Sequence, residues 1–142
     1  MNNQPGSQDH NSFFADIVIY GANSGGITAA IQARRSGKSV ILLEPTRWIG
    51  GLTASGLGET DFGRHDNPVH SSRGRTVGGL AREFYQRVRY YYDHQNSLEF
   101  PGVEPDVNTN TDIQRSFEPS VATAVYERML AENRVGPPST PA

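Results

Sequence analysis

The chain has 142 residues and no cysteine, and its 13 Lys plus Arg against 15 Asp plus Glu give a formal net charge of −2 at pH 7. This balance offers no positive field for nucleic acid or an anionic membrane, and the lack of cysteine excludes disulfides, thiolate metal sites and a cysteine nucleophile. The length suits one ordinary domain and leaves little room for a separate substrate domain.

The N-terminal segment, residues 1–15, is polar and rich in Asn, Gln and Ser, so we expect a flexible leader. An ordered domain over 16–135 and a disordered tail over 136–142 should follow. The leader lacks the basic and apolar regions of a secretory signal, and no stretch reaches the roughly 20 apolar residues of a membrane helix. These features predict a soluble, cytoplasmic protein.

A strand, a helix and a second strand are expected in the first third of the chain. Residues 17–20 are apolar on both faces, as in a buried parallel strand, and the next strand is "SVILLE" at 39–44. Between them a helix begins near Ser24, and Gly37 is suited to end it in a left-handed conformation. This order predicts an α/β fold, a partial Rossmann-like βαβ domain with additional helices and a right-handed crossover.

The turn "GANSGG" between the first strand and the helix is suited to a pyrophosphate, which helix N-termini bind through free N–H groups and the helix dipole. Gly21 allows a sharp turn, while Gly25 and Gly26 allow close approach of ligand and sheet. Asn23 replaces the usual middle glycine, but it tolerates left-handed dihedrals and its amide can donate to phosphate. The predicted contacts are Gly21, Asn23, Ser24, Gly25 and Gly26.

An acidic residue, Glu44, closes the second strand about 20 positions after Gly21, as the dinucleotide fingerprint expects for binding the adenosine ribose. A simple tight turn beside an ordinary carboxylate is the alternative, and the combined strand, turn, helix and acid favour dinucleotide binding over it. Glu44 also disfavours a cofactor that carries a 2′-phosphate, because two negative groups would meet.

Beyond Pro45 the sequence predicts a long glycine-rich loop over 46–79 and a helix within "GGLAREFYQRVRYYYDHQ", where Leu80, Phe84 and Val88 repeat at helical spacing. Residues 95–115 are polar and broken by prolines, which predicts a surface excursion. A last helix should run from Pro119 to Glu132, with its apolar stripe formed by Val121, Val125 and Met129.

The loop "PTRWIGGLTASGLGETDFG", together with "YGANSGGITAAIQARRSGKSVILLE", "GGLAREFY" and "FEPSVATAVYERML", resembles the FAD-dependent oxidoreductases related to glutathione-reductase-type flavoproteins. The resemblance covers roughly residues 16–130 and implies an FAD cofactor. It places Gly50, Gly51, Leu52 and Thr53 near the pyrophosphate and the flavin side, and Arg47 at the adenosine or pyrophosphate end. Paired glycines and a guanidinium both suit a diphosphate.

In the resembled fold a third strand and a large substrate domain follow the last helix, so we expect this chain to be an N-terminal portion. No catalytic residue is assigned, because a solvated role is the default for the loop and helix-end residues Glu59, Asp61, His65, His70 and His94. No metal site is predicted.

Two alternatives stay open. A nicotinamide-dependent dehydrogenase fragment would share the glycine turn and Glu44. A non-catalytic interaction protein could instead act through the tyrosine-rich helix around Tyr90, Tyr91 and Tyr92 or self-associate through an exposed core surface.

Overall fold

The computed structural model describes residues 12–60, 77–103 and 112–136. Its elements are β1 (Ile17–Tyr20), α1 (Ser24–Arg35), β2 (Val40–Leu43), a short 3-10 helix η1 (Gly51–Ala54), α3 (Gly79–Asp93) and α4 (Pro119–Glu132). The α/β class and the helices expected from the apolar spacing are confirmed. Most of the predicted leader and tail, residues 1–11 and 137–142, lies outside the described residues.

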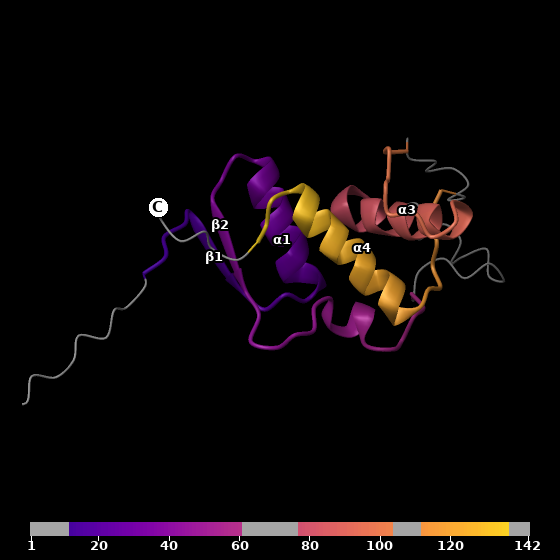
Figure 1. Cartoon of the computed structure of the whole chain (residues 1–142), viewed down its shortest axis with the longest axis horizontal. Coiled ribbons are helices and arrows are strands. Elements are labelled where there is room, and N and C mark those ends of the chain that lie inside the picture. The colour runs from indigo at the N-terminus through magenta and orange to yellow at the C-terminus, as the bar shows by residue number, and fades with distance from the viewer. Residues whose placement is uncertain (1–11, 61–76, 104–111, 137–142) are drawn as a thin grey trace, which may run out of the picture.

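A βαβ unit forms one end of the molecule (Figure 1). β1 and β2 are parallel neighbours, paired from Ile17 with Val40 to Tyr20 with Leu43, and the Gly21 N–H donates to the Leu43 carbonyl at 2.7 Å. Gly37, at φ 78°, follows α1, and the Lys38 N–H beyond it donates to the Ala33 carbonyl. The predicted glycine end of the helix is therefore confirmed.

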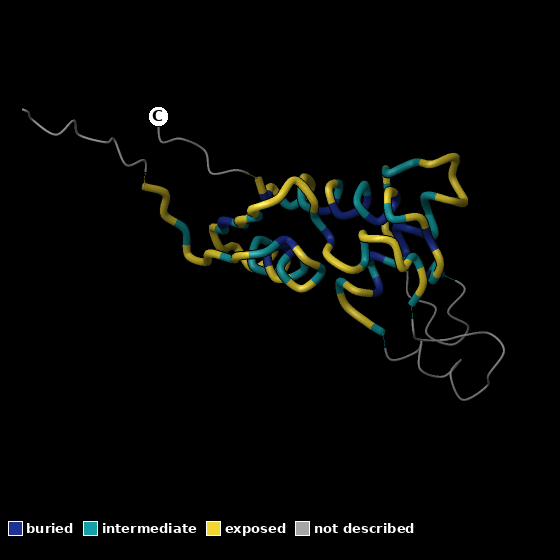
Figure 2. The backbone as a smooth tube through the Cα atoms, turned by 90° about the horizontal axis from the view of Figure 1, so that it is seen from below, coloured by how far each residue is buried: buried dark blue, intermediate teal, exposed yellow. Residues whose placement is uncertain are grey.

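Three helices enclose the apolar core, with α4 crossing between α1 and α3 (Figure 1). Buried residues gather along the inward sides of these helices (Figure 2). The predicted stripes supply much of that core: Ile27, Ala30 and Ile31 from α1, Phe84 and Val88 from α3, and Val121, Val125 and Met129 from α4. Hydrophobic burial at helical spacing explains why these three segments pack together.

The prediction that β1 is buried on both faces is wrong. Val18 is 58% exposed and Tyr20 is 76% exposed. In the described part of the chain the sheet has two strands, and α1 packs against both of them. The other face stays open to solvent, and self-association through such a surface stays a prediction.

The segment before α4 is also less superficial than predicted. Asp112 forms a bidentate ion pair with Arg82, and both side chains are at most 5% exposed. Gln86 donates to the same carboxylate at 2.8 Å, and Ile113 is buried. A surface excursion over all of 95–115 is therefore wrong, because an ion pair and an apolar side chain anchor its end to α3. Residues 104–111 lie outside the described residues.

Candidate functional site

A cleft of about 820 Å³ opens where the β1–α1 turn, the loop after β2, η1 and the start of α4 meet. Of the predicted site residues, Gly21, Asn23, Glu44, Gly51 and Leu52 line it. The other lining residues are Ala22, Thr46, Trp48, Ile49, Ala54, Ser55, Pro119, Ser120 and Thr123. Six predicted residues do not line the cleft, although each is next to a lining residue in the sequence or close to one. They are Ser24, Gly25, Gly26, Arg47, Gly50 and Thr53.

Asn23 caps α1. It is extended, at φ −75° and ψ 177°, and its Oδ1 accepts a hydrogen bond from the Gly26 N–H at 2.9 Å. The left-handed residue of the turn is Gly21, at φ 98°. Asn23 therefore serves as the N-cap of α1, and its backbone does not adopt the left-handed conformation that asparagine tolerates.

Close backbone packing explains the glycines. A Cβ at Gly26 would lie 1.9 Å from the Gly21 carbonyl oxygen, and a Cβ at Gly51 would lie 2.9 Å from the Cβ of Asn23. The Gly50 N–H donates to the Ala22 carbonyl at 2.7 Å, so the second glycine pair lies directly against the first turn. The two glycine motifs form one cradle in which side chains would clash.

Ser24 and Thr53 are joined within the protein beside the cleft. The Ser24 hydroxyl lies 2.8 Å from the Thr53 hydroxyl and donates to the Gly50 carbonyl at 3.3 Å. Both hydroxyls also hydrogen-bond the buried Tyr126 of α4; burial raises the pKa of Tyr126, and these two hydrogen bonds oppose the rise. Ser24 and Thr53 thus fix α1, η1 and α4 around the cleft.

Glu44 lies at the cleft wall and binds the turn. One carboxylate oxygen accepts from the Ala22 N–H at 2.8 Å, and the other accepts from the Thr46 N–H at 3.0 Å and the Thr46 hydroxyl at 2.8 Å. The Ala22 hydrogen bond, followed by those from Thr46, lowers the pKa of Glu44. The side chain is therefore an anion near neutral pH, with each oxygen able to accept further hydrogen bonds.

Backbone donors remain for an anion at the start of α1. The Gly26 N–H is used by the Asn23 cap and the Ala22 N–H by Glu44. Within the described residues, the N–H groups of Asn23 and Gly25 have no hydrogen-bond partner. The first turn of α1 also contains no acidic residue. The N-terminus of α1 therefore combines free donors with the positive end of a helix dipole.

Comparison with known proteins identifies the family. A family model described as FAD dependent oxidoreductase matches residues 16–136. The chain belongs to the FAD-dependent oxidoreductase family. FAD is therefore its cofactor class, and the family assignment disfavours the nicotinamide alternative.

Individual relatives are dehydrogenases by name. The β-cyclopiazonate dehydrogenase of Aspergillus flavus is 30% identical over 105 residues, which cover 73% of this chain and 22% of that protein. The corresponding enzyme of Aspergillus oryzae is 29% identical over the same length. The 4-oxocyclohexanecarboxylate 2-dehydrogenase of Sinomonas cyclohexanicum is 46% identical over 39 residues, 28% of this chain and 7% of that enzyme. The chain thus matches 22% of the length of the Aspergillus enzymes.

The cleft fits the diphosphate of FAD. Gly21 and Gly51 of the glycine cradle line it, a Cβ at Gly26 or Gly51 would disrupt the packing of that cradle, and free N–H groups remain at the start of α1. Glu44 supplies acceptors at the same wall. A flavoprotein needs these features from its nucleotide-binding part, while the redox chemistry belongs to the cofactor.

Nine of the residues that line the cleft were missed from the sequence, among them Thr46, Trp48, Ser120 and Thr123. Thr46 and Trp48 could have been found, because they lie between the ribose-binding acid and the second glycine pair. Ser120 and Thr123 carry no local signal; the start of α4 reaches the cleft because the Phe117 N–H donates to the Gly58 carbonyl at 2.8 Å.

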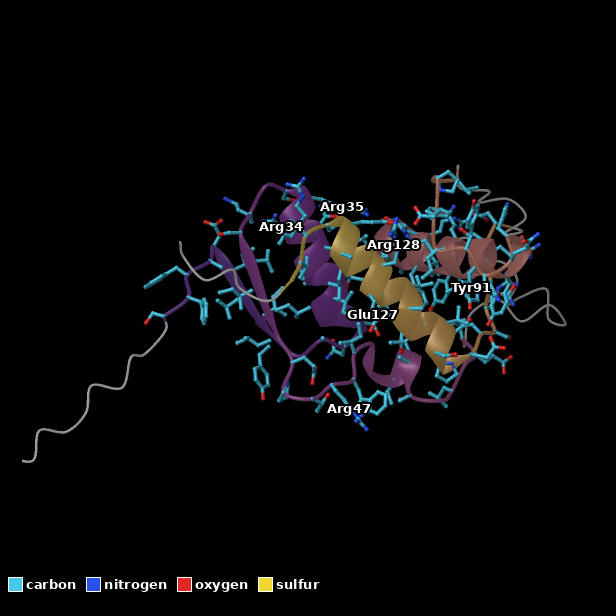
Figure 3. All side chains as sticks on the ribbon, viewed as in Figure 1. Arg34, Arg35, Arg47, Tyr91, Glu127 and Arg128 are labelled. Atoms are coloured by element: carbon cyan, nitrogen blue, oxygen red, sulfur yellow. The ribbon has the colours of Figure 1, made fainter. Side chains whose placement is uncertain are left out.

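Arg47 lies over an aromatic ring. Its guanidinium is 4.7 Å from the centroid of the Trp48 ring, and Figure 3 shows it at the outer edge of the loop between β2 and η1. This contact is a cation–π interaction at the surface.

Of the candidate proton-transfer residues, the structure describes His94 and Glu59. His94 stacks on Tyr90, with ring centroids 3.8 Å apart, and Glu59 is exposed. Asp61, His65 and His70 lie outside the described residues. Across the described ranges, no group of three or more His, Cys, Asp or Glu side chains could hold a metal, and no helix is long and apolar enough to span a membrane.

Proposed function

We propose that this chain binds FAD in the cleft, as the nucleotide-binding part of a flavin-dependent oxidoreductase of the glutathione-reductase type. One observation carries the proposal: the Gly21–Gly26 turn, Glu44 and the second glycine pair meet around a single cleft of about 820 Å³. Ligand clefts in proteins span about 300–1,000 Å³, so the volume is in the usual range of a small-molecule site.

The pyrophosphate binds at the start of α1. The free N–H groups of Asn23 and Gly25 and the dipole of a 12-residue helix attract the anion. The Oδ1 atom of Asn23 is engaged in the cap, so its Nδ2 amide provides a further donor. Gly21 and Gly26 act by keeping the turn narrow, and Ser24 acts through the hydroxyl pair with Thr53.

The adenosine ribose binds at Glu44. Its two oxygens already accept hydrogen bonds from Ala22 and Thr46, which fixes the carboxylate at the wall of the cleft and keeps it ionised. Carboxylate oxygens have several acceptor positions, so ribose hydroxyls can donate without displacing the protein donors. The negative charge also disfavours a 2′-phosphate.

The flavin half extends past Gly50 and Gly51 toward Leu52 and Thr53. When bound, FAD supplies the acceptor for two electrons. Because the relatives are named dehydrogenases, we propose that an enzyme containing this nucleotide-binding part oxidises its substrate by removing hydrogen. The residues of this chain bind and orient the cofactor.

The test is calorimetric titration of FAD into the wild-type chain, Glu44→Gln and Glu127→Gln. Glu127 is an exposed carboxylate on α4 and serves as the matched control. We expect Glu44→Gln to bind about tenfold more weakly, since it loses a charge-assisted hydrogen bond. Glu127→Gln should bind like the wild type. Equal affinities in all three proteins would contradict the role of Glu44.

A further inference from the structure

Trp48 is a large exposed aromatic residue within the cleft. Its side chain lines the cleft together with Glu44 and Thr46, yet it is 69% exposed. An indole left open in a concave site offers a broad apolar face that a planar ligand can cover. Within the described residues, no other aromatic ring lies against it.

The backbone of Trp48 is held relative to Glu44. The hydroxyl of Thr46 accepts from the Trp48 N–H at 3.1 Å, and it lies 3.1 Å from the Trp48 carbonyl oxygen and 2.8 Å from a carboxylate oxygen of Glu44. One threonine thus couples the backbone of Trp48 to the acid proposed to bind the ribose. Trp48 and Glu44 also line the same cleft, so the indole lies on the side of the cleft where the adenosine is proposed to bind.

Arg47 engages one face of the indole, with its guanidinium 4.7 Å from the ring centroid. This contact restrains the ring, which is still 69% exposed and lines the cleft, whereas Arg47 does not line it. Stacking of a nucleobase on an aromatic side chain requires one accessible face and no particular hydrogen bonds.

We propose that Trp48 is the stacking platform for the adenine ring of the cofactor, with Arg47 as a positioning residue behind it. The inference rests on the proposed function, because it assumes a dinucleotide in the cleft. Adenine is favoured over the flavin ring because Trp48 is coupled to Glu44 and precedes the Gly50–Gly51 pair that is proposed to lie toward the flavin. The face of the Trp48 indole would bind the adenine ring, and the Glu44 carboxylate would bind the ribose hydroxyls.

Trp48 is the single tryptophan of the chain, so tryptophan fluorescence reports on this residue alone. The wild-type chain is titrated with ADP, which represents the adenosine half of FAD and does not absorb in the range of tryptophan emission. We expect ADP to change the emission of Trp48, because the adenine ring covers the indole. Unchanged emission at ADP concentrations that saturate binding in calorimetry would overturn the assignment.

The affinity of Trp48 variants for FAD and ADP provides a second test. Calorimetry is used to compare FAD and ADP binding by the wild type, Trp48→Ala, Trp48→Phe and Phe14→Ala, the last being an exposed aromatic outside the cleft. Loss of stacking should weaken both ligands by about tenfold in Trp48→Ala, while Trp48→Phe retains most of the affinity. Phe14→Ala should bind like the wild type. The melting temperature confirms that the variants fold.

These experiments distinguish the stacking role of Trp48 from FAD binding by the chain. Wild-type affinity of Trp48→Ala for both ligands would overturn the stacking role while leaving FAD binding in place. Failure of the wild type to bind FAD would overturn the proposed function, and the role of Trp48 with it.

Discussion

In the turn between β1 and α1, the space around each backbone position decides whether a side chain is tolerated there. Asn23 replaces a glycine without loss of the turn, because an extended asparagine caps the helix through Oδ1. Gly26 has no such freedom, since its Cα lies against the Gly21 carbonyl. The two positions show that the fingerprint tolerates a side chain where the backbone is open and excludes one where two segments touch.

Substitution Gly26→Ala should therefore destabilise the fold. The new Cβ would lie 1.9 Å from a backbone oxygen, so the turn or the helix must shift, at a cost of roughly 3 kcal/mol. Gly78→Ala is the control, because its φ is −134° and nothing lies within 4 Å of the added atom. Chemical denaturation measures both; equal free energies of unfolding for the two variants would show that the contact at Gly26 is not limiting.

Among the elements, α3 and the segment before α4 are joined by a buried ion pair rather than by apolar packing alone. Arg82 and Asp112 pair bidentately, and Gln86 adds a third hydrogen bond. Burial costs each ion its hydration, so the pair holds its geometry only while both members are present. This clamp helps to hold the chain entering α4, whose first turn lines the cleft.

Asp112→Asn should lower the free energy of unfolding by about 3 kcal/mol, because the buried guanidinium loses its counter-charge. The matched control is Asp93→Asn, which breaks the exposed pair with Arg89. Exposed pairs contribute about 0–1 kcal/mol, so this variant should stay near the wild type. Denaturant titration distinguishes them, and a loss at Asp93 as large as that at Asp112 would count against the clamp.

The sequence predicted the elements well because helical spacing and glycine ends are local properties. Val121, Val125 and Met129 could be assigned to a core from their spacing alone. The clamp of Arg82 and Asp112 could not, since it joins residues 30 positions apart through burial that no local pattern reveals. The exposure of Tyr20 was missed for a similar reason. An apolar strand sequence does not reveal whether helices cover one face of the strand or both faces.

For the molecule as a whole, a chain of ion pairs links the three helices. Glu83 of α3 pairs with Arg35 of α1 and with Arg87, and Arg87 also pairs with Glu132 of α4. Figure 3 shows Arg35 near one end of α4, close to the labelled Arg128, which pairs with the same Glu132. The network thus spans the helix layer that carries the cleft.

This network predicts a loss of stability in acid. Burial of Glu83 opposes ionisation, but its bonds to Arg35 and Arg87 lower its pKa below the ordinary value of 4.5. A lowered carboxyl pKa in the folded state contributes stability that is complete above the unfolded pKa and is lost as the pH falls through the folded one. The melting temperature should therefore decline below about pH 5.

Glu83→Gln should flatten that decline and be less stable than the wild type at pH 7, whereas Glu127→Gln should keep the wild-type slope. Thermal unfolding followed by circular dichroism across this pH range measures both. An unchanged slope in Glu83→Gln would assign the acid sensitivity to other carboxylates.

We propose above all that this chain holds FAD in the cleft around its glycine cradle. Equilibrium dialysis of the purified wild-type chain against FAD, followed by visible absorbance of the flavin on each side of the membrane, tests it most directly. We expect an excess of FAD on the protein side that saturates near one molecule per chain and falls in Glu44→Gln. An equal FAD concentration on both sides, with a folded protein, would contradict it.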